Sequence, residues 1–341
     1  MSSAFMISSD LAASTSDTRA YLVTLKGGLP GYRVMHESGS MMEVYAHGAT
    51  VTSFKDARSR EYLFLSGASI FDGVKPIRGG IPLIFPKFGG GWDGPTNPTD
   101  LPSHGFARRS TWGITTVSTP TGDRIAFTLD PSGISSEFAA AWPHDFKLTY
   151  IVSLGPVGFS TEMVIANPAG AAAPFEFQTL LHTYYNIGAI ESVSVKGLQG
   201  ATYIDQLQAR GEFTEERGAI PFASETDAIY KAALGKGGEG NALTISGLAF
   251  DTEGTVALRT SCSLDGTARP NDVVVWNPWV AKSIRMADFG DEEYHTMLCV
   301  EPGAVDGPTS LGPGQEFRLK QIVERVSGPM SCAAPAAPSS K

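Results

Sequence analysis

The chain has 341 residues, of which 42% are hydrophobic and 18% charged, a globular balance that argues against a chain disordered throughout. Its formal net charge of −9 offers no general attraction to phosphate backbones or anionic lipid, so neither nucleic acid nor a membrane is expected as a partner. No apolar run reaches the length of a membrane-spanning helix. The three cysteines are widely spaced and lack a CxxC pair, which favours a reducing, cytoplasmic location over a disulfide framework or zinc cluster.

Signals for β-strands recur along the chain, whereas helical periodicity is confined to short pieces. Between residues 146 and 154, apolar and polar side chains alternate, which is the pattern of a half-buried strand. A serine that can cap a short helix opens the alanine-rich stretch 135–142. The 38 glycines and 22 prolines supply turns that suit many short strands. The predicted strands lie, in chain order, at 125–129, 146–154, 273–276, 297–300 and 317–319.

The core reads as one all-β domain at residues 21–326. It has no repeat of fixed period and no sharp break in composition, and long antiparallel strands packed as a sandwich suit it. Residues 1–20 are serine-rich with few basic residues, which predicts a flexible leader; an organelle signal there stays open. Residues 327–341 are rich in Pro, Ala and Ser and predict a disordered tail.

The first candidate site segment surrounds Arg78. This arginine lies between Pro76 and the pair Gly79-Gly80, and a glycine pair lets another part of the chain approach the backbone closely. A guanidinium held in such a loop is a good ligand for an anion. The alternative is a Gly/Pro loop whose arginine simply faces water.

A second segment, 101–108, sets His104 and Arg108 four residues apart beside a glycine, in a turn-rich region. Both side chains could face one cleft. The alternative for a single histidine such as His104 is a structural hydrogen bond.

Two further segments each offer a group that can transfer protons. His182 lies in an aromatic, strand-like run, which predicts at least partial burial, and its type of side chain titrates near neutral pH. Glu301 ends a hydrophobic strand where a Pro-Gly turn begins, a place where a carboxylate can be held as an oriented base. The alternatives are a hydrogen-bonded core histidine and a solvent-facing glutamate.

Taken in this order, the four segments resemble the glucose-6-phosphate 1-epimerases, the hexose-6-phosphate mutarotases related to galactose mutarotase. The stretches Val274–Trp279 and Asp288–Asp291 strengthen the likeness, which covers roughly residues 25–325. It implies a large single-domain antiparallel β-sandwich, the galactose-mutarotase-like supersandwich, whose concave face binds a pyranose. It also implies an isomerase that needs neither a metal nor an organic cofactor.

The resemblance also implies roles for individual residues. Glu301 would take the proton from the anomeric hydroxyl, and His182 would protonate the ring oxygen, so that the ring opens to the aldehyde and recloses as the other anomer. Arg78 and Arg108 would bind the substrate and its phosphate, and Asp205 would hold a sugar hydroxyl.

His104 would be a neighbouring substrate-binding residue, together with Ser103. At Ser103 the sequence departs from the family, which usually has a glutamine there, and a shorter side chain suggests a bridging water. At Ala281 an acidic residue is common in the family. These two departures bear on sugar preference more than on the reaction.

The expected partner is therefore a small sugar phosphate, handled by a monomer. Glucose 6-phosphate is the first expectation, although the sequence does not identify the preferred hexose phosphate. Two alternatives remain: a mutarotase for unphosphorylated aldoses, and a sugar-binding or regulatory module that uses the same fold without catalysis.

Overall fold

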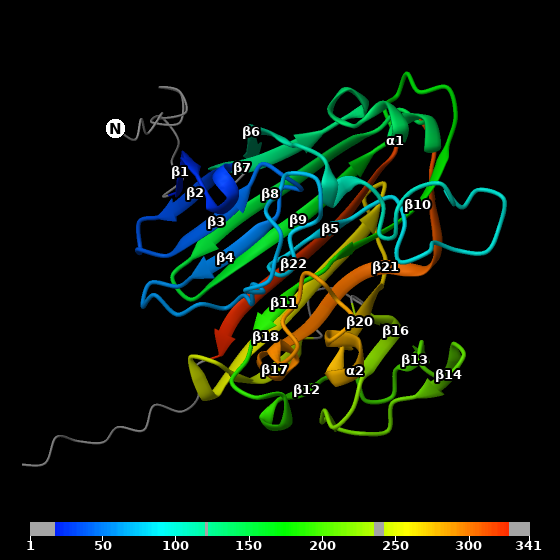
Figure 1. The fold of residues 1–341 in the computed structure, drawn as a ribbon. Coiled ribbons are helices and arrows are strands. Elements are labelled where there is room, and N and C mark those ends of the chain that lie inside the picture. Colours follow the sequence, from blue (N-terminus) through cyan, green and yellow to red (C-terminus); the bar gives the residue numbers. More distant parts are fainter. Residues whose placement is uncertain (1–17, 120–121, 235–241, 327–341) are drawn as a thin grey trace, which may run out of the picture.

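The computed structural model describes residues 18–119, 122–234 and 242–326, which form antiparallel sheets with few helices (Figure 1). The predicted all-β fold is confirmed. Each predicted strand coincides with an observed one to within one residue or lies inside it, namely β7 (Gly122–Leu129), β8 (Lys147–Gly155), β20 (Asn271–Asn277), β21 (Met297–Leu311) and β22 (Glu316–Val326).

The described helices are short. The helix predicted at 135–142 is α1 (Ser136–Ala141), and the Ser135 hydroxyl accepts a hydrogen bond from the amide of Phe138 at 3.2 Å, as an N-cap should. Bilayer spans need about 20 residues, and neither α1 nor α2 (Trp279–Ser283) approaches that length. The 3₁₀ turns are η2 (Lys26–Gly28), η3 (Ala107–Arg109), η4 (Pro131–Gly133), η5 (Ile190–Ser192) and η6 (Glu293–Thr296).

The first and the last described residues both lie in strands. Strand β1 starts at Thr18, inside the predicted leader, and β22 ends at Val326. The rest of the predicted leader and the predicted tail lie outside the described residues.

One sheet, called the site sheet below, has eight strands. Its paired strands are antiparallel, and β11 (Tyr184–Asn186) pairs with β21 beside the main path. The path runs β14 (Gly211–Thr214), β13 (Thr202–Asp205), β16 (Thr226–Leu234), β20, β21, β10 (Phe175–Leu181) and β5 (Leu83–Ile84).

A second sheet, the back sheet, has ten strands and packs against the site sheet, and a four-stranded sheet also packs on the back sheet and shares the same core (Figure 1). The back sheet runs β15 (Ala219–Ile220), β12 (Ser194–Lys196), β17 (Leu243–Leu248), β18 (Asp251–Leu264), β22, β9 (Gly158–Ala166), β8, β7 and β6 (Gly113–Thr119), with β19 (Thr267–Ala268) beside β18. The four-stranded sheet comprises β1 (Thr18–Thr24), β2 (Pro30–His36), β3 (Met41–Tyr45) and β4 (Val51–Lys55).

The two faces of the site sheet carry different side chains because successive residues of a strand point to opposite faces. On β20, Val273 and Val275 are buried in the main core between the sheets, whereas Trp276 belongs to a second cluster on the other face. On β21, Val300 joins the main core and Cys299 the second cluster. Glu301, two residues after Cys299, points to this second face as well. A site can therefore be built there.

The loop that carries Arg78 is fixed by close backbone contacts, as the glycine pair predicted. The Arg78 amide donates to Ser69 Oγ at 2.8 Å, and the Gly80 amide donates to Phe64 O at 2.7 Å. A Cβ added at Gly80 would lie 1.9 Å from Val51 O, so no larger residue fits without moving the backbone.

We expect Gly80→Ala to destabilise the protein by about 3 kcal/mol, the upper part of the usual range for single substitutions, because the methyl group collides with the backbone at Val51. Gly28→Ala is the matched control: Gly28 has φ +73, close to the +66 of Gly80, but no atom lies within 4 Å of its added Cβ. Chemical denaturation of both variants measures the difference. Equal losses would mean that backbone strain, and not the close contact, sets the cost.

Candidate active site

A cavity of about 250 Å³ opens on the face of the site sheet that points away from the main core. Part of its wall comes from strands of that sheet and from the residues that directly follow β10 and β13, and the remainder comes from the loops after β4 and β5 and from the region of α2. The lining residues are Arg78, Phe88, Gly89, His104, His182, Gln206, Asp227, Val274, Trp276, Lys282, Met286 and Glu301.

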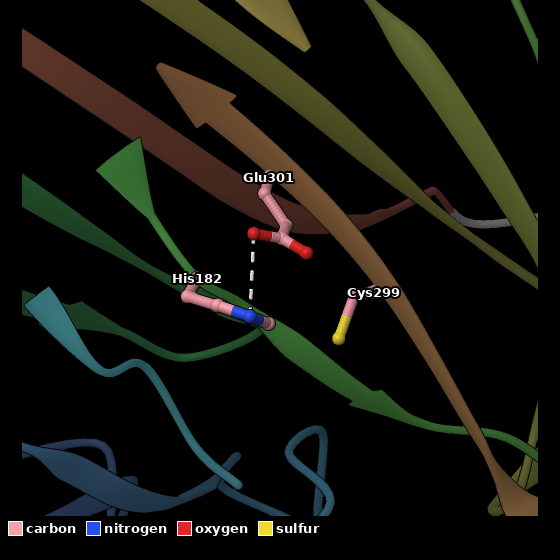
Figure 2. Close-up of side chains that lie close together, drawn as sticks. All are labelled: His182, Cys299 and Glu301. Carbon is pink, nitrogen blue, oxygen red and sulfur yellow. Dashed lines mark ion pairs between the residues drawn. The ribbon is translucent and has the colours of Figure 1, made fainter. Parts of the chain in front are cut away.

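His182 and Glu301 lie side by side at this cavity (Figure 2). His182 follows the last residue of β10, Glu301 lies in β21, and the distance from His182 Nδ1 to Glu301 Oε2 is 3.3 Å. Among the described residues neither of these atoms has a partner in hydrogen-bonding geometry, although both are buried. The pair is thus in contact but leaves its polar atoms available to a third group.

The imidazole of His182 is held flat against an aromatic ring. Its ring centre lies 4.7 Å from that of Tyr184 with the planes 8° apart, and Trp276 meets it edge-on at 6.0 Å. These contacts restrict the imidazole to the orientation in which one ring nitrogen faces Glu301.

Burial pushes the two pKa values of the pair in opposite directions. The pKa of Glu301 is well above its ordinary value, chiefly because of desolvation, with the negative charge of Asp227 adding to the shift. The pKa of His182 is well below its ordinary value, again because of desolvation, and Arg108 and Arg78 lower it further. Burial therefore disfavours the charged form of both groups.

Arg78 lies in the cavity wall, and its guanidinium contacts two side chains. Its guanidinium donates to the Tyr184 hydroxyl at 3.2 Å and pairs with Asp288 Oδ2 at 3.2 Å, while Nε is buried without a partner among the described residues. Desolvation lowers the pKa of Arg78, but Tyr184 and Asp288 raise it more, so the group stays charged.

Arg108, His104 and Ser103 form a loop beside the cavity. Arg108 is not part of the lining, yet burial and the charge of Arg78 lower its pKa to about 10, and its charge lowers the pKa of His104. Its Nη2 donates to the backbone oxygen of Ser103 at 2.9 Å, whereas its buried Nε has no partner in the described parts of the chain. His104 lines the cavity, and its Nδ1 accepts from the Gly89 amide at 3.2 Å.

Besides Arg108, two predicted site residues, Asp205 and Ser103, are not part of the lining. The Asp205 carboxylate accepts hydrogen bonds from the Leu207 amide at 2.9 Å and from Gln208 Nε2 at 2.6 Å. On β13 it is Ile204 that faces the second cluster, so the alternation turns Asp205 to the other side. Ser103 is exposed and contributes its backbone oxygen to Arg108.

Sequence reasoning missed three polar residues of the lining: Gln206, Asp227 and Lys282. Gln206 Nε2 donates to Asp227 Oδ1 at 2.5 Å, and Lys282 Nζ lies 3.3 Å from Asp227 Oδ2. Desolvation raises the pKa of Asp227. The sequence signal for Lys282 is its place directly after Ala281, in the stretch that follows Trp279.

Two other hollows of the surface are larger but lack a buried acid-base pair in their lining. One of about 410 Å³ is lined by Trp142, His144 and Glu176 among others, and one of about 460 Å³ by Arg109 and Glu137 among others. Neither brings a buried acid and a buried base together. The cavity at His182 and Glu301 is therefore the candidate active site.

Comparison with known proteins identifies the family of the chain. The family model described as aldose 1-epimerase matches residues 31–324. The chain belongs to the aldose 1-epimerase family. A relative from Cenchrus ciliaris is 37% identical over 311 residues, covering 90% of this chain and 88% of the relative. One from Escherichia coli K12 is 33% identical over 254 residues, covering 74% and 76%. Both carry the provisional name glucose-6-phosphate 1-epimerase.

Solved structures give the same result. A provisionally named mutarotase from Salmonella typhimurium matches with a TM-score of 0.71 at 27% identity, covering 91% of this chain and 94% of the other. The predicted family, the galactose-mutarotase-like sandwich and the assignment to the isomerases are confirmed. This aldose 1-epimerase family protein is therefore an enzyme, an isomerase.

Replacing Glu301 by glutamine should stabilise the fold relative to wild type, and this gain should grow as the pH rises. The pKa of Glu301 is raised in the folded state, so the folded protein retains a proton that the unfolded chain releases above about pH 4.5, and stability falls as the pH rises towards the folded pKa. Glutamine cannot ionise and removes this loss. We expect Glu301→Gln to gain stability over wild type between pH 5 and 7.5, measured by denaturant unfolding.

The control for this test is Glu324→Gln on β22, whose carboxylate pairs with Arg259 at a side-chain exposure of 49%. A gain at Glu301 that does not grow with pH would show that the buried carboxyl is ionised in the folded state.

Proposed function

We propose that this enzyme interconverts the α and β anomers of hexose 6-phosphates, with glucose 6-phosphate as its main substrate. The observation that carries the proposal is the contact of His182 with Glu301 in a cavity that has Arg78 and Lys282 on its wall. Its relatives' provisional names point the same way.

The distance between the two groups suits acid-base ring opening. The anomeric and ring oxygens of a pyranose are bonded to the same carbon, so the base and the acid that serve them must be close neighbours. Glu301 and His182 are 3.3 Å apart, and neither polar atom is committed to another side chain among the described residues.

In the forward step, the Glu301 carboxylate removes the proton of the anomeric hydroxyl, and the His182 imidazolium gives its proton to the ring oxygen. The bond between C1 and the ring oxygen breaks, and the aldehyde forms. After rotation about the C1–C2 bond, the hydroxyl attacks the opposite face of the aldehyde. Protonated Glu301 then returns its proton to the anomeric oxygen and His182 regains its own, so both groups end as they began.

Binding of the phosphate would rely on local cations, because the protein is acidic overall. A phosphate monoester carries about −1.5 to −2 charges at pH 7 and prefers guanidinium groups. Arg78 and Arg108 each retain a buried Nε that has no partner among the described residues, and Lys282 adds an ammonium group on the wall. These are the groups we assign to the phosphate.

The phosphate would also prepare the acid. The positive charges of Arg108 and Arg78 both lower the pKa of His182, whereas Arg108 is the one of the two that lowers the pKa of Glu301. A phosphate dianion bound to both arginines would offset their positive charges and so raise the pKa of His182 back towards its ordinary value. A higher pKa favours the imidazolium that the forward step requires.

We expect wild-type protein to accelerate the relaxation of freshly generated α-glucose 6-phosphate, followed by polarimetry or NMR. Glu301→Gln should slow this by about 10²–10⁴-fold, the usual contribution of a general acid or base, while retaining much of the binding. Unphosphorylated glucose is the matched substrate. Equal rates on both sugars would favour the mutarotase for free aldoses, and tight binding in calorimetry without acceleration would favour a non-catalytic module.

Supplying the phosphate as a separate molecule tests its second role. Inorganic phosphate should raise the enzymatic rate on unphosphorylated glucose in a saturable manner, after subtraction of the enzyme-free rate in the same buffer. Arg108→Ala should abolish the increase, while Arg109→Ala, whose neighbouring side chain lines a different hollow, should retain it. Potassium chloride at equal ionic strength controls for salt. A rate that phosphate leaves unchanged would limit the arginines to binding.

A further inference from the structure

A third residue shares the cluster formed by His182 and Glu301, and the ring-opening chemistry does not use it. Cys299 lies two residues before Glu301 on β21, so both side chains project from the same face of the site sheet (Figure 2). One ligand atom from each of the three residues, an imidazole nitrogen, the Cys299 sulfur and a carboxylate oxygen, lies within 4.8 Å of the others.

We propose that His182, Cys299 and Glu301 form an inhibitory site for a thiophilic divalent cation such as Zn²⁺. Imidazole, thiolate and carboxylate are the ligands that zinc takes in proteins, and three protein ligands leave one coordination position open towards the cavity. Inhibition, though not binding, rests on the catalytic roles proposed above.

The cluster has atoms to spare for a metal. His182 Nδ1 and Glu301 Oε2 are buried and have no hydrogen-bond partner among the described residues. Leaving buried polar atoms unsatisfied costs free energy, and coordination to one cation would satisfy both.

The geometry requires a small adjustment. In a tetrahedral zinc site with bonds of about 2.0–2.3 Å, the ligand atoms lie about 3.5 Å apart. His182 Nδ1 and Glu301 Oε2 already meet this spacing at 3.3 Å, and the longest separation in the cluster is at most 4.8 Å. The cluster must therefore contract by about 1 Å, which rotation of the Cys299 side chain can supply.

The surrounding charges allow a cation to enter. Arg78 is paired with Asp288, and Lys282 with Asp227 and Glu225, which leaves Arg108 as the main opposing charge among the groups that act on Glu301. Binding displaces the thiol proton of Cys299 and any proton on Glu301, both of which pass to solvent. The metal and two anionic ligands then carry no net charge.

A bound cation would stop the reaction because it occupies the lone pairs that move protons. It would also fill the space where the anomeric carbon must lie, so inhibition should be competitive with substrate. Mg²⁺ and Ca²⁺ prefer six or more oxygen ligands and should not inhibit in this way.

The test measures metal binding directly and does not depend on activity. In a Cys332→Ser background, which removes the thiol of the predicted tail, the full-length protein is titrated with Zn²⁺ by calorimetry and with Co²⁺ by absorbance. We expect one ion per chain and a thiolate-to-cobalt charge-transfer band. Cys299→Ser should weaken Kd by roughly 100-fold or more, at or above what second-shell changes cost in metal sites.

Cys262→Ser is the matched control, because Cys262 is equally reduced and buried but lies in the core on β18. It should leave metal binding and enzymatic rate unchanged. His182→Gln is a second variant that removes a different ligand, in case the first fails to fold, and thermal unfolding checks both. Absence of the charge-transfer band, or equal Zn²⁺ affinity in wild type and Cys299→Ser, would overturn the proposal even if anomer interconversion is fast.

Discussion

The period-two alternation of the site sheet is the constraint on which the rest of the molecule depends. On β20 and β21, one set of side chains fills the main core and the other set faces the cavity, so packing and chemistry are carried by neighbouring residues of the same strands. Val300 is buried in the core, and Cys299 and Glu301 on either side of it face the site. A one-residue slip in register would exchange the two sets and remove both the core and the active site together.

The burial of His182 Nδ1 and Glu301 Oε2 without hydrogen-bond partners among the described residues is unfavourable by itself, and the fold tolerates it because the strands around it are held by long antiparallel ladders. This burial disfavours the charged form of both groups, because it raises the pKa of Glu301 and lowers that of His182. A site stabilised by a strong ion pair would hold the proton in one place and would be a poorer catalyst.

Much of this could be predicted from the sequence, but in different ways for different residues. Alternation identified β8, a short apolar run identified the start of β21, and the glycine pair identified the fixed loop at Arg78. Motif likeness selected Asp205, whereas the structure turns its neighbour Gln206 to the cavity. Tyr203 and Ile204 are both hydrophobic, so the local pattern could not show which side chains of β13 face the cavity. Lys282 meets Asp227 across 55 positions of the chain, a pairing that only the sheet order creates.

The position of Cys299 makes the site open to two kinds of chemistry. An acid-base pair for anomer interconversion needs an imidazole and a carboxylate with free lone pairs, close together and shielded from water, and a soft metal ion needs the same arrangement with one sulfur added. The strand alternation places residue 299 beside Glu301, so its identity decides whether the cluster has two ligand types or three. An enzyme with a thiol there combines a site suited to proton transfer with a sensitivity to zinc that an alanine at that position would lack.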